Sequence, residues 1–287
     1  MLLPLLFLGI INCLEYNKLV YKCNNEGEAL LSFDGGPSSN NTAKLLSYLS
    51  KENITAAFFL TAANTASNQP LAKQILSQGH LLGYRFETEW NITAMTDEGL
   101  YNSIERSLDS IRSLVGRRPR MIRANDHCGE NGGMSNALVT KMCYAGYSLV
   151  SSKVDGKDFN LTAIGSWPSP FQAVEAGLAK MGGSDSPIIQ LHDTNWLSVN
   201  ETRLIVDGVK AKGFKLVSAS QCFGVDNFYQ DEVSAKIPPF YGDIPNLKNH
   251  PEDEGKVFSA QSANSSPSLK SHLGHSIILF ILLFLFT

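Results

Sequence analysis

Short apolar segments alternate with longer amphipathic ones through most of the chain. The short segments have the length and composition of strands, and seven are predicted, at 29–34, 55–60, 80–86, 120–124, 147–155, 187–193 and 214–220. The segments between them predict helices at 42–51, 70–78, 97–115, 134–145, 169–181 and 200–212. Strands separated by helices are typical of parallel strands joined by crossovers, so we expect an α/β fold, either open or closed into a barrel.

The alternation covers residues 15–227, which we predict to be one folded domain. From about Phe228 the sequence becomes rich in proline, asparagine and charge and has no period. Residues 228–264 are therefore predicted to be a stalk.

Both ends of the sequence carry apolar runs that we interpret as targeting signals. Residues 1–14 are predicted to be a secretory signal peptide, because the apolar run is short and polar sequence follows it.

Small residues at 264–266, a polar spacer and the apolar run 276–287 have the order of a glycosylphosphatidylinositol (GPI) attachment signal. That run would cover only about 18 Å as a helix, less than a bilayer core. We predict lipidation at Asn264, removal of 265–287, and a protein on the outer face of the plasma membrane. The alternatives are a buried N-terminal helix and a C-terminal membrane helix.

Charge and cysteine content agree with an extracellular protein. The net charge of −3 gives no reason to expect nucleic acid as a partner, and we expect a monomer. Of the five cysteines, Cys13 lies in or beside the signal peptide, which leaves enough for two disulfides. Asparagines that we predict to be glycosylated, at exposed positions, are Asn40, Asn53, Asn91, Asn160 and Asn200.

Charged side chains gather where the predicted strands end. In parallel barrels these ends form the active face. A lone histidine or an Asp before Gly-Gly is usually structural, but several such positions on one face favour a functional or formerly functional site. The residues concerned are Asp34, Arg85, Glu87, Glu89, Arg123, Asp126, Asp155, His192 and Asp193.

Five segments in order resemble the motifs of the polysaccharide deacetylase family, which shares the NodB homology domain (carbohydrate esterase family 4), and most of all those of chitin deacetylases. They are "SFDGGP" (32–37), "GHLLGYRFETEW" (79–90), "RAND" (123–126), "DGKDF" (155–159) and "IIQLHD" (188–193). The resemblance covers about residues 23–225. It implies a distorted (β/α) barrel of about seven parallel strands. It also suggests the disulfides Cys23–Cys222 and Cys128–Cys143.

The family's chemistry is metal-assisted amide hydrolysis. An Asp and two His residues hold a divalent ion, often zinc, a second Asp is the base, and a His is the acid. By resemblance, Asp34 takes the base position and His192 the acid position. Arg123 and Asp155 take the places of the pair that orients the base.

All three metal-ligand positions differ from the family pattern: they are Gly35, Arg85 and Glu89. Glycine has no side chain and arginine is a permanent cation, so neither binds zinc. The family's Tyr that helps hold the oxyanion aligns with Asp126, and its motif Trp aligns with Phe159. We therefore expect no bound metal, vestigial catalytic positions, and a guanidinium of Arg85 that faces Asp34 or Glu89 as a structural ion pair.

Three functions remain open from the sequence. The first is a deacetylase fold with little or no activity that binds chitin or another polysaccharide of the adjacent cell wall. The second is an active chitin or chitooligosaccharide deacetylase whose rebuilt site holds zinc or cobalt. The third is a binding module for a protein partner.

Overall fold

The computed structural model describes residues 20–87, 94–123, 134–159 and 168–230. All of them belong to one compact unit, Met1–Pro238. The second unit, Pro239–Thr287, contains the predicted anchor signal and lies outside the described residues, as do the predicted signal peptide and most of the stalk. Within the described ranges, no helix has both the length and the apolar character needed to cross a membrane.

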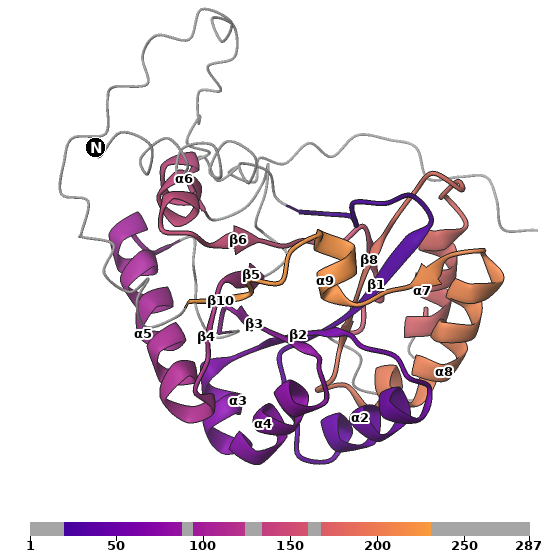
Figure 1. Ribbon diagram of the computed structural model, residues 1–287, viewed down its shortest axis with the longest axis horizontal. Coiled ribbons are helices and arrows are strands. Elements are labelled where there is room, and N and C mark those ends of the chain that lie inside the picture. Colours follow the sequence, from indigo (N-terminus) through magenta and orange to yellow (C-terminus); the bar gives the residue numbers. More distant parts are fainter. Residues whose placement is uncertain (1–19, 88–93, 124–133, 160–167, 231–287) are drawn as a thin grey trace, which may run out of the picture. The chain divides into compact units, whose positions relative to one another are not determined.

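Most strands form one parallel sheet, in the order β6-β5-β3-β2-β1-β8-β7, with β9 beside β1 (Figure 1). These strands are β1 (Glu28–Asp34), β2 (Ala57–Leu60), β3 (Leu81–Arg85), β5 (Met121–Arg123), β6 (Ser148–Leu149), β7 (Val154–Asp155), β8 (Ile188–His192) and β9 (Lys215–Leu216). Every pairing within this sheet is parallel. The expected barrel of about seven parallel strands is confirmed, in the form of a curved half-barrel.

The predicted strand 147–155 is two short strands, and this corrects the sequence analysis. β6 and β7 lie at opposite ends of the strand order, because β6 pairs with β5 and β7 pairs with β8. The backbone N–H groups of Val150 and Lys153 donate to Ile122 (2.9 Å) and Ile188 (3.0 Å), on those two neighbours. Residues 150–153 therefore connect the two edges of the curved sheet.

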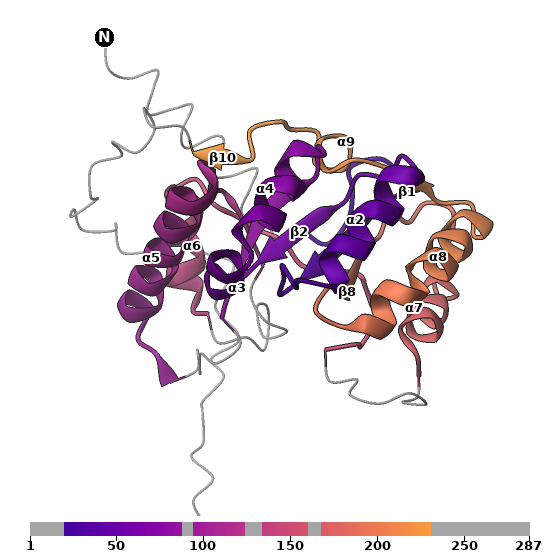
Figure 2. The ribbon, with the colours of Figure 1, turned by 90° about the horizontal axis from the view of Figure 1, so that it is seen from below.

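Helices cover the outer side of the sheet. Figure 1 shows α5, α3, α4, α2, α8 and α7 along this side, and Figure 2 shows the same helices in front of the strands. The helices are α2 (Asn41–Lys51), α3 (Ala62–Ser67), α4 (Gln69–Ser77), α5 (Asp97–Val115), α6 (Asn136–Tyr144), α7 (Pro170–Leu178), α8 (Trp196–Ala211) and α9 (Ala219–Phe223). The predictions overlap six of them; α3 and α9 were not predicted, and α9 replaces the end of the predicted strand 214–220.

Local sequence accounts for the bounds of α5, the longest helix in the described ranges. The Thr96 side chain accepts a hydrogen bond from the Gly99 N–H and so caps the N-terminus. Apolar side chains at three- to four-residue spacing, Leu100 and Ile104 among them, are buried against the sheet. Gly116 ends the helix with φ +77°, a left-handed conformation that glycine adopts without strain.

Alternation along the strands divides the core into an outer and an inner layer. On β1, Leu31 and Phe33 pack toward the helices, whereas Leu30 belongs to a second cluster inside the barrel. Successive side chains point to opposite faces of a strand, so Ser32 and Asp34 also point inward. This parity brings polar side chains into the barrel at the strand ends.

The chain after β9 closes the base of the domain. Cys222 of α9 forms a disulfide with Cys23, as the family resemblance suggested. The chain then runs through buried Phe228 into β10 (Tyr229–Gln230), which pairs antiparallel with β4 (Arg118–Pro119). The folded part therefore extends past residue 227, where the sequence placed its end.

Candidate functional site

Ionisable side chains at the ends of four strands lie together at one end of the barrel interior. Asp34 and His192 are register partners on the neighbouring strands β1 and β8, and Arg85 and Arg123 are partners on β3 and β5. Each lies two or four residues after a side chain of the inner core cluster, so all four point inward. All are at most 6% exposed. The predicted convergence of these four residues is therefore present.

Arg123 holds Asp34 at the centre of this group. Its Nη1 donates to Asp34 Oδ1 at 2.8 Å and to Ser32 Oγ at 3.0 Å. The guanidinium lies 4.2 Å from the ring centroid of Phe59, a favourable cation–π arrangement. Burial lowers the pKa of Arg123, and the charge of Asp34 opposes that shift. The carboxylate is thus fixed by a charge-assisted hydrogen bond from a side chain that is itself packed on an aromatic ring.

Arg85 lies on the other side of the same carboxylate. Its Nε is 3.7 Å from Asp34 Oδ2, so an ion pair forms with Asp34, one of the two partners expected; the other, Glu89, lies outside the described residues. That distance is too long for a hydrogen bond, and both atoms lack a hydrogen-bond partner among the described residues. Burial raises the pKa of Asp34, while the charges of Arg123 and Arg85 act against the rise.

His192 is oriented by Asp158, a residue whose role the sequence analysis missed. Asp158 Oδ1 lies 2.6 Å from His192 Nδ1, and Oδ2 accepts from the His192 backbone N–H at 2.7 Å. Ser198 Oγ also donates to this carboxylate. Burial disfavours the imidazolium, but the hydrogen bond and charge of Asp158 outweigh it and raise the pKa of His192. The Nε2 atom has no hydrogen-bond partner in the described part of the chain.

The turn after β1 is held from several sides. Asn64 donates to the Gly35 carbonyl at 2.6 Å, and Gly35 has φ +87°, where glycine is favoured. The carboxylate of Asp193 packs directly on Gly36, where an added Cβ would lie 2.0 Å from Oδ2. Thr42 Oγ1 donates to that oxygen at 2.6 Å. Burial raises the pKa of Asp193 to about 6.

Known proteins are similar to this chain in sequence and in fold. Residues 21–148 match the family model described as polysaccharide deacetylase. The chain is 23% identical over 225 residues to a chitin deacetylase from Colletotrichum lindemuthianum, covering 74% of this chain and 86% of that protein. The solved structure of that enzyme aligns with a TM-score of 0.65 at 21% identity, over 75% of this chain and 96% of the other. Residues 21–148 therefore resemble the polysaccharide deacetylase family, and the fold of the chitin deacetylase extends over 75% of the chain.

Two further relatives show the range of this family. A peptidoglycan-N-acetylglucosamine deacetylase from Listeria monocytogenes is 22% identical over 76% of this chain, but the match covers only 44% of that protein. A CE4 family pseudoenzyme from Bacillus anthracis shares the fold at 14% identity, with a TM-score of 0.58 over 72% of this chain and 69% of the other. A mutant of it is described as having restored enzymatic activity.

The described side chains at the polysaccharide deacetylase metal position do not fit a divalent ion. Gly35 offers no ligand atom, and the ideal Cβ position on it lies 3.3 Å from Arg85 Nη1. At ~4 Å and an effective dielectric near 20, a guanidinium repels a divalent ion by on the order of 8 kcal/mol before relaxation. The described ranges contain no group of three His, Cys, Asp or Glu side chains that could hold a metal. Glu89, the third ligand position, lies outside them.

The other predicted positions have varied surroundings. Asp155 Oδ1 accepts from the Lys157 N–H at 2.8 Å, a local turn contact, and its charge slightly opposes the lowering of the Arg123 pKa by burial. Glu87 Oε1 accepts from the Ala62 N–H at the start of α3. Phe159 is 57% exposed, with its ring 6.4 Å from that of His192.

Predicted residues that lie outside the described ranges are Asp126, Cys128, Asn91, Asn160 and Asn264. Because Cys128 is among them, the pairing of Cys143 stays a prediction.

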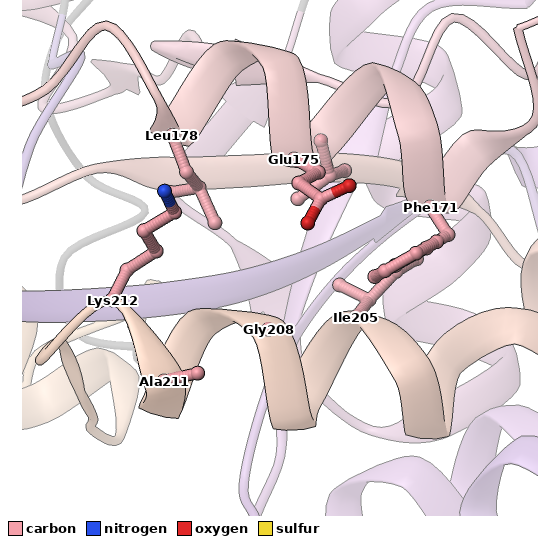
Figure 3. Close-up of a pocket in the computed structure, with 8 residues that line it drawn as sticks. Phe171, Glu175, Leu178, Ile205, Gly208, Ala211 and Lys212 are labelled. Carbon is pink, nitrogen blue, oxygen red and sulfur yellow. The ribbon is translucent and has the colours of Figure 1, made fainter.

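A groove of about 280 Å³ lies elsewhere, between α7 and α8 on the outer side of the barrel. Figure 3 shows Phe171, Glu175 and Leu178 of α7 facing Ile205, Gly208 and Ala211 of α8, with Lys212 at one end. Its lining includes none of the strand-end residues that form the candidate site. The groove is therefore separate from the candidate site, and we assign it no part in the chemistry of that site.

Proposed function

We propose that this chain is a metal-free member of the polysaccharide deacetylase family that binds chitin or a related wall polysaccharide and has little or no deacetylase activity. The observation that carries the proposal is the position of Arg85, whose guanidinium lies beside Asp34 and against Gly35. An internal cation there pairs with the family's base carboxylate where the family has a metal ion. The buried pair removes the need for a metal to balance the charge of Asp34.

The expected loss of activity follows from the chemistry that a metal supplies. A bound ion lowers the pKa of its water from ~15.7 to about 7 and stabilises charge in the transition state. Without the metal ion, a general acid and a general base raise the rate by a factor on the order of 10²–10⁴, which is too little for fast amide hydrolysis. The pseudoenzyme from Bacillus anthracis supports the proposal as a precedent for this fold without activity.

Metal content and acetate release test this proposal together. The purified protein should contain no stoichiometric zinc or cobalt, and acetate release from chitin oligomers should stay near background with or without a chelator. The triple variant Gly35→Asp, Arg85→His, Glu89→His should take up about one zinc per chain, whereas Arg85→Gln, which removes the cation but supplies no ligand set, should not. Stoichiometric metal and chelator-sensitive deacetylation in the unmodified protein would refute the proposal. Pull-down on insoluble chitin tests the binding part.

An active deacetylase with a rebuilt site is the second candidate. The observation that favours it is the intact pair at His192: Asp158 holds Nδ1 at 2.6 Å and leaves Nε2 without a partner in the described residues. A histidine held in this way suits a general acid. Activity that persists in Arg85→Gln but disappears in His192→Gln would support this candidate over the first.

We also propose that the protein is glycosylated and attached to the outer face of the plasma membrane by a GPI anchor at Asn264. The chitin deacetylase relative and the Cys23–Cys222 disulfide fit an extracellular site. The side chains of Asn40, Asn53 and Asn200 are exposed, as glycan attachment requires. Phosphatidylinositol-specific phospholipase C should release the protein from intact cells. Detection of residues 276–287 in the mature protein by mass spectrometry would contradict the anchor.

A further inference from the structure

Arg85 presents hydrogen-bond donors to the place where Gly35 lacks a side chain. The nearest atom to an ideal Cβ on Gly35 is Arg85 Nη1 at 3.3 Å, followed by Thr194 Cγ2 and Oγ1 at 3.7 and 3.8 Å. An atom placed against Gly35 would therefore touch the guanidinium closely and the Thr194 side chain at van der Waals distance. The opposite edge of the guanidinium, at Nε, faces Asp34.

These donors are not used within the described part of the protein. Arg85 is 6% exposed, its Nε has no hydrogen-bond partner there, and its one ion pair within the described ranges, with Asp34, has an N–O distance of 3.7 Å. Asp34 does not compensate it fully, because its Oδ1 is already bonded to Arg123 at 2.8 Å. A buried guanidinium with free donors is a strong site for a planar, bidentate acceptor.

The nearby carboxylates are each engaged elsewhere. Asp158 bonds to His192 and Ser198, Asp193 bonds to Thr42, and Asp155 bonds to the Lys157 backbone. His192 Nε2 is a second buried nitrogen without a partner in the described ranges. His192 is the register partner of Asp34 on the neighbouring strand, so it belongs to the same group of residues.

We propose that this site binds a carboxylate, which pairs with Arg85 on the side that faces Gly35. The inference rests on the proposed function, because a metal-free site is required. The ligand group would stand where the family's metal-binding aspartate carries its own carboxylate, so a site that selects a cation in the family selects an anion here. The carboxylate belongs either to a uronic acid unit of an acidic polysaccharide or to a free small acid, and both present the same group to Arg85.

Calorimetric titration with three probes tests the proposal. Glucuronic acid oligomers and acetate should bind and compete with one another, and neutral N-acetylglucosamine oligomers of equal length should not displace acetate. Arg85→Met should weaken the binding of either acid at least tenfold. Tighter binding of the oligomers than of acetate identifies the polysaccharide source, and equal binding identifies the small acid. Absence of binding by both acids, or unchanged binding in Arg85→Met, overturns the inference.

Two substitutions of equal size at Gly35 provide the matched control. Asp and Asn both tolerate a positive φ better than other side chains, so Gly35→Asp and Gly35→Asn carry similar strain. Both side chains would fill the place proposed for the ligand's carboxylate, so both variants should weaken acid binding at least tenfold. Gly35→Asp also supplies an internal carboxylate to Arg85 and should be the more stable of the two. Unchanged acid binding in either variant would place the acid elsewhere and would overturn the proposal.

The outcome can be separated from that of the proposed function. Zinc analysis of the same preparations reports on the metal-free site directly. A protein without zinc that binds no acid refutes this inference alone, while a protein with stoichiometric zinc refutes the proposed function as well. Melting temperatures of the Gly35 variants establish that both are folded before binding is compared.

Discussion

Replacing Arg123 by methionine is expected to lower the free energy of unfolding by about 3–5 kcal/mol, the usual effect of removing one partner of a buried ion pair. Asp34 has no solvent exposure. Among the described residues, its carboxylate accepts one hydrogen bond, and Arg123 is the donor. The substitution also removes the guanidinium from the ring of Phe59 and from Ser32 Oγ. Urea denaturation followed by circular dichroism measures the change.

Two comparison variants separate the charge from the packing. Arg203→Met removes an arginine whose side chain is 80% exposed and should change stability by less than about 0.5 kcal/mol. Adding Asp34→Asn to Arg123→Met removes the uncompensated charge and should recover a substantial part of the loss. A loss below about 1 kcal/mol in Arg123→Met would show that Asp34 does not depend on this partner.

Removing the Cys23–Cys222 disulfide is expected to cost about 3–5 kcal/mol in the chain-entropy description, in which long loops give the larger effects. The two cysteines are separated by 199 positions, and both side chains are fully buried in the inner core cluster. The bond ties the segment before β1 to α9, near the two ends of the described domain. The double variant Cys23→Ala, Cys222→Ala should unfold at a correspondingly lower urea concentration.

Reduction of the unmodified protein is the control for that experiment. If the bond itself stabilises the domain, dithiothreitol should lower the stability of the native protein more than that of the double variant, which keeps only the predicted Cys128–Cys143 pair. A double variant as stable as the oxidised protein would mean that the loop constraint contributes little. Peptide mapping without reduction should recover the Cys23–Cys222 link and also tests the predicted Cys128–Cys143 pair.

The sequence predicted most strands and helices because their periodicity is strong, and it failed where tertiary contacts decide. Segment 147–155 was predicted as one strand, yet it divides because its halves pair with strands at opposite edges of the sheet. α3 and α9 span only 62–67 and 219–223, too short for a helical period to be recognised. Phe228 looks like part of a stalk in the sequence but is buried against the base of the barrel.

The predicted site residues that lie on regular strands are brought together in the structure. Asp34, Arg85, Arg123 and His192 were expected to converge because they lie at the ends of predicted strands and within the family motifs. Asp158 was missed although its motif was recognised, because the path of the chain after β7 decides which carboxylate reaches His192. Lys157 has φ +52°, and the turn around it sends Asp155 back to the local backbone and Asp158 to His192. A pattern of residue types does not contain that information.

The central position of β1 has a consequence for how the protein is made. Its two long neighbours are β2, which follows soon in the sequence, and β8, whose Ile189 accepts a hydrogen bond from Ser32 across 157 residues. During synthesis on the ribosome, one edge of β1 therefore has no native partner until most of the domain has been translated. An unpaired strand edge is a template for aggregation, and long-range parallel pairing forms slowly. The strand that presents Asp34 thus belongs to the part of the nascent chain that most needs protection by chaperones.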